Sequence, residues 1–363
     1  MDILDYFYQN PPKLENFIPR KQSIEFKKTL LKGPMICGKT SLVLDFLNKF
    51  DRFLYINLGD IRLLDYKFLS NLIEFIKTKQ IKAICIDEIE KFGFLDTDFV
   101  QNLEKNCENI VFITNKNDFE INGFESLSLY GLDYEEFIAF YHKNYGEITL
   151  FSHFLALGNS PKSAFLNSNN EYLNAMLKSR FDELEIKTLA QISEKISKPF
   201  NAYEIFKKLK QTNKISKDRF YANLINLEKY GVISFASDLS KKAKFRRVFF
   251  NDFALKSVLG FEKNPNATIA NMVFCELRKL GVEIKFSDFS DFLLPNLHQA
   301  IIIAPFLPND LAILRIKKQI KHFLDLGIHK ITIISNSGEI DTAFEGIKIV
   351  VMPFWHWAAG ISA

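Results

Sequence analysis

The chain has 363 residues, with 47 basic and 43 acidic side chains and a formal net charge of +4. Hydrophobic residues make up 47% and charged residues 25%, a globular balance that excludes a wholly disordered chain, and 15 Gly with 11 Pro excludes a collagen-like one. At about 150 residues per domain, this length predicts two or three domains.

The cysteines, the histidines and the lengths of the apolar runs exclude further classes of protein. The four cysteines lie far apart without a CxxC pair, so neither a disulfide framework nor a zinc ribbon is expected, and the six scattered histidines do not suggest a metal site. The first residues show no secretory signal, and apolar runs such as 300–307 are far shorter than the ~20 residues that span a bilayer. We expect a cytoplasmic protein without membrane contact.

After an opening segment, residues 1–131 alternate short apolar runs with amphipathic stretches of helical length. The runs predict strands at 29–31, 53–58, 83–86, 110–113 and 126–129, and the stretches between them predict helices at 40–50, 66–77 and 96–106. This alternation is typical of an α/β fold, a parallel sheet with helices on both faces. A Walker A pattern at residues 33–41 makes it the expected core of a P-loop NTPase.

The pattern then changes twice. Residues 132–180 predict a helical lid or linker, and residues 181–250 predict three helices followed by a basic, β-prone segment. From 251 to 363 an α/β pattern returns. Its helices are expected at 269–280 and 311–326, and its strands at 282–286, 289–294, 300–303, 331–334 and 347–352. The expected domains are therefore 1–131, 132–180, 181–250 and 251–363.

The strongest motif is a Walker A pattern, in which a glycine and four further residues precede Gly-Lys-Thr. It comprises Gly33, Pro34, Met35, Ile36, Cys37, Gly38, Lys39, Thr40 and Ser41. The two glycines let backbone N–H groups turn toward phosphate oxygens. Lys39 supplies a point charge to the β- and γ-phosphates, and the Thr40 hydroxyl is a ligand for Mg²⁺. The expected cofactors are ATP and Mg²⁺.

A second motif ends the apolar run at 83–86 with Asp87 and Glu88. Ligands bind at the carboxyl ends of parallel strands, so Asp87 is expected to hold Mg²⁺ and Glu88 to polarise the attacking water. The extra strand between this motif and the Walker A loop favours the ATPase group that inserts one there, rather than kinases or GTPases.

The next strand ends in Thr114 and Asn115. Either side chain could orient the water against the γ-phosphate, and Thr114 is preferred, although an Asn-rich turn that only closes the strand is an open alternative. The expected catalytic residues are thus Glu88, Lys39 and Thr114, with Asp60 as a lesser addition.

Several stretches carry a family resemblance. They are residues 18–20, the Walker A loop, 55–60, 86–89, 132–137 and the turn at 158–161. With them, the chain resembles the AAA-type ATP-binding proteins of bacteria and archaea, in which a winged helix and a restriction-endonuclease-like domain follow the ATPase. Asp252 resembles the aspartate that opens the last of these domains.

The sequence departs from that family at two places. The family's arginine within the Walker A loop is absent, since Met35, Ile36 and Cys37 stand there. In the C-terminal domain Ala270 replaces the glutamate of the first helix, and although Asp291 is present, the strand that follows lacks both a carboxylate and a lysine. The resemblance therefore implies a nuclease-like fold without nuclease chemistry.

Positive charge is concentrated in residues 207–250, which hold twelve basic and three acidic side chains, a balance of +9 against −5 for the rest. Such a segment on a winged helix favours duplex DNA as a partner, with Lys217, Arg219 and Asn223 toward the groove and a wing at 241–247 on the backbone. A protein-interaction module is the alternative.

The favoured function is an ATPase that binds Mg-ATP and couples its nucleotide state to the winged helix. The alternative is a nucleotide-gated DNA-binding or scaffold protein with negligible turnover. No arginine finger stands out among Arg20, Arg52, Arg62 and Arg180, so an oligomer stays open.

Overall fold

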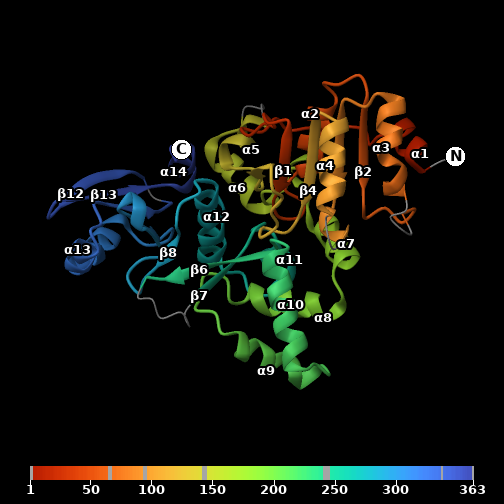
Figure 1. Cartoon of the computed structure of the whole chain (residues 1–363). Coiled ribbons are helices and arrows are strands. Elements are labelled where there is room, and N and C mark those ends of the chain that lie inside the picture. The colour runs from red at the N-terminus through yellow and green to blue at the C-terminus, as the bar shows by residue number, and fades with distance from the viewer. Residues whose placement is uncertain are drawn as a thin grey trace. The chain divides into compact units, whose positions relative to one another are not determined.

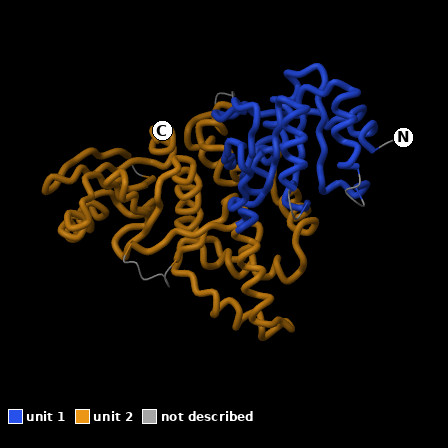
Figure 2. The backbone as a smooth tube through the Cα atoms, viewed as in Figure 1, with its two compact units in different colours: residues 1–131, 160–165, 229–232 blue, residues 132–159, 166–228, 233–363 orange. Residues whose placement is uncertain are grey.

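The structure is a computed structural model that describes residues 3–63, 68–92, 96–140, 145–239, 246–336 and 338–361. Its contacts divide the chain into two compact units (Figure 2). Unit 1 comprises residues 1–131, 160–165 and 229–232, and unit 2 comprises residues 132–159, 166–228 and 233–363. Because the chain passes repeatedly from one unit to the other, neither unit is a single continuous segment.

Unit 1 is built on a five-stranded sheet in the order β2-β3-β4-β1-β5 (Figure 1). Its strands are β1 (Lys28–Lys32), β2 (Phe53–Asn57), β3 (Ala83–Asp87), β4 (Asn109–Thr114) and β5 (Glu125–Ser128). Every neighbouring pair is parallel, which confirms the predicted parallel sheet. Strand β4 lies between β1 and β3 and separates the two strands that carry the motifs.

Helices cover both faces of this sheet. They are α1 (Ile3–Gln9), α2 (Lys39–Leu47), α3 (Phe68–Lys79) and α4 (Thr97–Asn106), with short 3-10 turns at η1 (Ile89–Phe92) and η2 (Ser163–Phe165). Successive strand residues enter different cores: Ile84 packs with α1, α3 and α4, whereas Cys85 packs with α2. Since both faces are buried, the strands read as continuous apolar runs. Helix α1 was not predicted, because seven residues are too few to establish a period.

Six helices follow among the described residues between 132 and 230. They are α5 (Tyr134–Phe140), α6 (Glu147–Leu157), α7 (Asn170–Arg180), α8 (Glu183–Ser193), α9 (Ala202–Thr212) and α10 (Lys217–Lys229). Asp182 and Glu185 form a reciprocal capping box at α8, and the Asn201 side chain accepts two backbone N–H groups at the start of α9. In the described part of the chain, no helix combines the length and apolar character needed to cross a bilayer.

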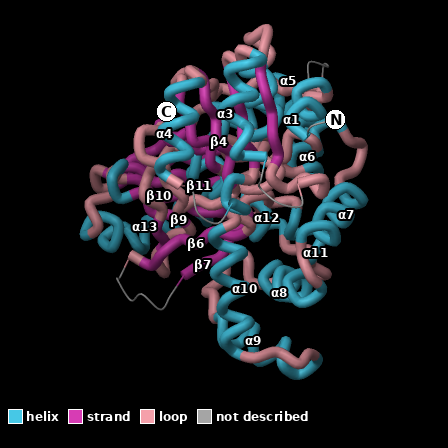
Figure 3. Tube along the Cα trace, turned by 45° about the vertical axis from the view of Figure 1, so that its right-hand side comes forward, coloured by secondary structure: helices cyan, strands magenta, loops and turns pink. Residues whose placement is uncertain are grey.

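Unit 2 contains an eight-stranded mixed sheet in the order β12-β13-β11-β10-β9-β8-β6-β7. The strands are β6 (Ile233–Asp238), β7 (Arg246–Phe250), β8 (Lys285–Phe286), β9 (Phe292–Leu294), β10 (Gln299–Ile303), β11 (Lys330–Ile334), β12 (Ile340–Phe344) and β13 (Ile347–Met352). The helical elements are α11 (Leu255–Leu259), α12 (Pro265–Lys279), η3 (Pro295–Leu297), α13 (Asn309–Asp325) and α14 (Phe354–Ala359). Figure 3 shows β6, β7, β9, β10 and β11 together with α12 and α13. Strands from both sides of residue 250, where a domain boundary is expected, belong to this one sheet. The division of the chain into four domains stays a prediction.

Strands β8 and β9 are shorter than the sequence suggested. A turn separates them, in which the Ser287 and Ser290 hydroxyls lie 3.0 Å apart and the Phe289 N–H donates to Ser287 Oγ. Strand β12 was not predicted, because it is an edge strand that pairs only with β13 and leaves its polar side chains toward solvent.

Phenylalanine, used 37 times, builds much of the core of unit 2. The rings of Phe154 and Phe253 have centroids 4.9 Å apart, and Tyr134 lies 5.4 Å from Phe154 and 5.7 Å from Phe354. These contacts hold α14 against α5 and α6. Phe354 and Trp357 are therefore part of this core.

One buried carboxylate in this core makes the stability of unit 2 depend on pH. Burial raises the pKa of Glu276 from 4.5 to about 7, and its Oε1 accepts the Tyr134 N–H at 3.0 Å. Between these pH values the folded chain binds more protons than the unfolded chain, so stability falls as pH rises.

We expect Glu276→Gln to make the free energy of unfolding less dependent on pH, because Gln keeps the hydrogen-bond acceptor without the charge. Relative to wild type, the variant should gain about 3 kcal/mol in free energy of unfolding as the pH rises from 4.5 to 7. Denaturant unfolding across this range measures it, with the exposed Glu171→Gln as control. Parallel curves for wild type and Glu276→Gln would contradict the expectation.

Candidate nucleotide-binding site

The Walker A loop connects β1 to α2 in a conformation that requires glycine. A Cβ on Gly33 would lie 2.1 Å from the Leu129 carbonyl oxygen, so no other residue fits. Gly38 adopts φ 96° immediately before α2, and Ile36 adopts φ 58°, which is rare for a β-branched residue. The loop thus holds a strained backbone that leads into a helix N-terminus, where backbone N–H groups favour an anion.

Lys39 is buried at the start of α2, with 7% of its surface exposed. Its Nζ donates to the carbonyl oxygens of Gly33 and Pro34 at 2.8 and 2.7 Å, and to Asn115 Oδ1 at 3.0 Å. The ammonium group therefore lies between the loop and the carboxyl end of β4.

Asp87 lies at the end of β3 and collects three donors. Its Oδ2 accepts from Thr40 Oγ1 at 3.1 Å and from the Tyr55 hydroxyl at 2.6 Å, and its Oδ1 accepts the Glu88 N–H at 2.7 Å. Burial raises the pKa of Asp87, whereas the hydrogen bond from Tyr55 lowers it. Burial and the adjacent carboxylate also raise the pKa of Tyr55, which keeps this hydroxyl a donor. The paired Thr40 and Asp87 oxygens are the hard ligands that Mg²⁺ prefers.

Glu88 follows with a left-handed backbone, φ 56°, and a buried side chain. Its Oε2 lies 2.6 Å from Lys91 Nζ, and a Cβ on Gly59 would approach this oxygen to 2.5 Å. Position 59, two residues after the end of β2, must therefore be small for the carboxylate to occupy this position.

The two polar residues at the end of β4 have different surroundings. Thr114 is fully buried and its Oγ1 accepts the Lys116 N–H at 3.0 Å. Asn115 contacts Lys39 through Oδ1 and donates from Nδ2 to Glu90 Oε1 at 2.8 Å. Asn115 therefore contacts the Lys39 ammonium, and the catalytic role of Thr114 stays a prediction.

The contacts of Asp60 and Arg20 differ from what the sequence motifs suggested. Asp60 forms an ion pair with Arg62, which lowers the pKa of Asp60, so its carboxylate is engaged away from the motifs. Arg20 donates to the carbonyl oxygens of Cys37, Tyr130 and Gly131 at 2.9, 2.8 and 3.1 Å. The guanidinium group against the Walker A loop thus comes from the opening segment and not from within the loop.

Sequence reasoning missed the contacts of Tyr55 and Arg20. A signal for Tyr55 exists, because a polar-tipped ring in an apolar strand needs a partner for its hydroxyl. Tyr55 pairs in register with Cys85, two residues before Asp87 on the same face, which brings the ring within reach. No local pattern could have predicted Arg20, since its partners are distant in sequence.

The basic segment is partly neutralised within unit 2. Arg219 lies 3.3 Å from Asp182, Arg246 lies 3.9 Å from Glu228 and Arg247 lies 3.5 Å from Asp291. The amide nitrogen of Asn223 is buried, so Lys217, Arg219 and Asn223 do not form one free set. Of the expected wing at 241–247, residues 241–245 lie outside the described residues.

We expect Tyr55→Phe to lower the free energy of unfolding by about 1–2 kcal/mol, because the buried Asp87 carboxylate loses a hydrogen-bond donor. The apparent Tm should fall by about 2–4 °C for each kcal/mol lost. Differential scanning calorimetry measures the change, and Tyr203→Phe, at an exposed position, is the matched control. Equal melting of both variants would show that the hydroxyl is unimportant to Asp87.

Comparison with known proteins gives a family match for the first part of the chain. Residues 25–138 match the family model described as an AAA domain, from just before β1 into α5. The uncharacterized protein MJ1544 of Methanocaldococcus jannaschii is 27% identical over 383 aligned positions, covering 88% of this chain and 86% of that protein.

Two solved structures are also similar. The Walker-type ATPase PABY2304 of Pyrococcus abyssi is 15% identical with a TM-score of 0.43, covering 64% of this chain and 91% of its own. The signal transduction ATPase with numerous domains PH0952 of Pyrococcus horikoshii is 17% identical with a TM-score of 0.31, covering 87% of this chain and 52% of its own. Because both TM-scores are below 0.5, the family model carries the comparison, and residues 25–138 are similar to the AAA domain that it describes.

Proposed function

We propose that the protein is an AAA-type ATPase that binds Mg-ATP and hydrolyses it. The observation that carries this proposal is the hydrogen bond between Thr40 and Asp87, which joins the Walker A loop to the carboxyl end of β3. It brings the metal-binding pair of the two motifs together beside Lys39. The AAA family match over residues 25–138 supports the same reading.

In this proposal each part of the site has one role. The backbone N–H groups of loop 33–41 and the Lys39 ammonium bind phosphate oxygens, while Thr40 and Asp87 hold Mg²⁺. The metal ion, when bound, neutralises charge that develops on the phosphates. Glu88 orients and deprotonates the attacking water, and Asn115 holds the Lys39 side chain in position.

One contact favours the second candidate, a nucleotide-gated module with negligible turnover. The Lys91 ammonium lies 2.6 Å from Glu88 Oε2 and forms an ion pair with this carboxylate. A carboxylate engaged with Lys91 is not available to a water molecule, and ATP would then act as a bound switch.

We further propose a winged helix at residues 181–250. Helices α8, α9 and α10 precede the antiparallel pair β6–β7, and isolated bridges from Ile196 to Val248 and from Pro199 to Arg247 place residues 196–199 beside β7. This order of elements is typical of the fold. The net positive charge of residues 207–250 makes duplex DNA the candidate partner. The ion pairs of Arg219, Arg246 and Arg247 reduce the positive charge that is available to DNA phosphates.

The α/β segment at 251–363 remains, in our proposal, a nuclease-like domain without nuclease chemistry. Ala270 is buried on α12, and β10 carries only Gln and apolar residues. Asp291 is held by the Ile303 N–H at 2.7 Å and by Arg247. Within the described residues, no three His, Cys, Asp or Glu side chains form a group that could hold a metal ion.

We expect Lys39→Ala to weaken Mg-ATP binding at least about tenfold, because the phosphates lose a buried ammonium. Glu88→Gln should retain binding and lower kcat by about 10²–10⁴-fold. Fluorescent-nucleotide titration and phosphate release measure the two effects, and the exposed Lys49→Ala is the control. Unchanged binding by Lys39→Ala would refute nucleotide binding at this loop, and full turnover by Glu88→Gln would refute the role of Glu88.

If the basic segment binds duplex DNA, affinity should be measurable at ~50 mM salt and fall as salt rises, since phosphate contacts release counterions. Lys217→Gln should weaken binding uniformly across sequences and reduce the salt slope by about one. Fluorescence anisotropy with an unrelated duplex measures both, with ATPase activity recorded with and without DNA. Lack of binding at ~50 mM salt leaves the protein-interaction alternative.

A further inference from the structure

Residues 229–232, which we call the connector, join helix α10 to strand β6. Helix α10 ends at Lys229 and β6 begins at Ile233. The connector belongs to unit 1, whereas residues 166–228 before it and 233–363 after it belong to unit 2 (Figure 2). A change in the contacts of the connector therefore reaches α10 directly along the chain.

The connector packs against the Walker A loop at Gly231. A Cβ on Gly231 would lie 3.0 Å from Pro34 Cα and 3.2 Å from Pro34 Cβ, which is closer than ordinary van der Waals contact. Gly231 also adopts φ +65°, a left-handed conformation that favours glycine. The connector therefore approaches Pro34 this closely because residue 231 has no side chain.

The connector also contacts the residues that follow strand β4. The Asn117 N–H donates to the Lys229 carbonyl oxygen at 3.3 Å, and Lys229 Nζ lies 3.2 Å from Asp118 Oδ2. The Lys116 ammonium lies 5.8 Å from the centroid of the Tyr230 ring, within the range of a cation–π interaction. Two successive residues of the connector are thus held by the segment that leaves the carboxyl end of β4.

One buried ammonium group holds both structures that the connector contacts. Lys39 Nζ donates to the Pro34 carbonyl oxygen at 2.7 Å, to Asn115 Oδ1 at 3.0 Å and to the Gly33 carbonyl oxygen at 2.8 Å. A lysine has three N–H donors, so a phosphate oxygen that binds this ammonium replaces at least one of these acceptors. Pro34 contacts the connector, and Asn115 directly precedes the residues that do. Phosphate binding at Lys39 therefore changes the support of the connector.

We propose that the connector transmits ATP binding from the Walker A loop to helix α10, and that the effect is reciprocal. This inference rests on the proposed function, because it requires ATP phosphates at Lys39. The β- and γ-phosphates attract the Lys39 ammonium and weaken its hydrogen bonds to Pro34 and Asn115. The connector and the last turn of α10 are then less firmly held. By linkage, a ligand that fixes α10 changes ATP affinity by the same factor by which ATP changes the affinity for that ligand.

Two glycines with the same backbone conformation test the effect of the connector on the nucleotide site. Gly231 and Gly281 are each the second residue after a helix, with φ of +65° and +64°, but a Cβ on Gly281 would meet nothing within 4 Å. Alanine introduces the same backbone strain at both positions, and only Gly231→Ala also displaces Pro34. Titration of the full chain with a fluorescent ATP analogue should show at least about fivefold weaker binding for Gly231→Ala and unchanged binding for Gly281→Ala.

Hydrogen exchange of the wild-type chain tests the opposite direction and needs no variant. Saturation with Mg²⁺ and adenylyl imidodiphosphate, an ATP analogue that is not hydrolysed, should accelerate amide exchange in residues 225–233 at least about twofold. The turn at 279–283, which contains Gly281, is the internal control and should be unchanged. Thermal unfolding of both alanine variants establishes that they are folded.

The outcomes separate this inference from the proposed function. Absence of nucleotide binding by the wild-type chain would refute both. Nucleotide binding with unchanged or slower exchange in residues 225–233 would refute only the inference. Wild-type ATP affinity in Gly231→Ala would also refute it, as would an equal loss in Gly281→Ala, which assigns the effect to backbone strain alone.

Discussion

The buried carboxylate of Asp87 is the point on which the nucleotide site of unit 1 depends. It ends β3, accepts from Thr40 on α2 and from Tyr55 on β2, and holds the N–H of Glu88 in a left-handed turn. Burial of an ionised group is unfavourable without such donors. The same contacts that stabilise this carboxylate therefore bring two strands, one helix and both motifs into register.

The glycines of unit 1 serve this arrangement by leaving room. Gly33 allows the backbone to pass close to Leu129 at the exit of β5, and Gly59 leaves space for the Glu88 carboxylate. Arg20 then ties the Walker A loop to residues 130–131, at the end of the continuous N-terminal part of unit 1. The Walker A loop is thus held by the backbone at Leu129 and by the Arg20 side chain.

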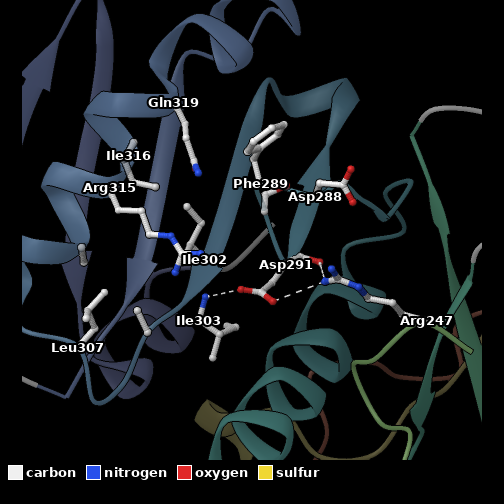
Figure 4. A pocket seen from close by; sticks show the side chains of 13 residues that line it. Arg247, Asp288, Phe289, Asp291, Ile302, Ile303, Leu307, Arg315, Ile316 and Gln319 are labelled. Atoms are coloured by element: carbon white, nitrogen blue, oxygen red, sulfur yellow. Dashed lines mark hydrogen bonds and ion pairs between the residues drawn. The ribbon is translucent and has the colours of Figure 1, made fainter.

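In unit 2, many charged side chains surround a phenylalanine-rich core. Its arginines pair with acids from distant segments, as Arg219 does with Asp182 and Arg247 with Asp291. The +9 balance of residues 207–250 is therefore not entirely presented to a partner. The Arg247–Asp291 pair instead lies within unit 2, where both residues line a cavity beside α13 (Figure 4).

The sequence alone determined the parallel sheet, the Walker A loop and the acidic end of β3, because these follow from local periodicity and from short motifs with strict stereochemistry. It could not predict the contacts of Tyr55, Arg20 and Asn115, since these contacts join residues 17 to 111 positions apart. It also missed the edge strand β12 and overestimated β8 and β9, whose limits depend on their partners in the sheet. Which charges pair and which stay free was decided only by the tertiary structure, because pairing depends on distance in space and not on composition.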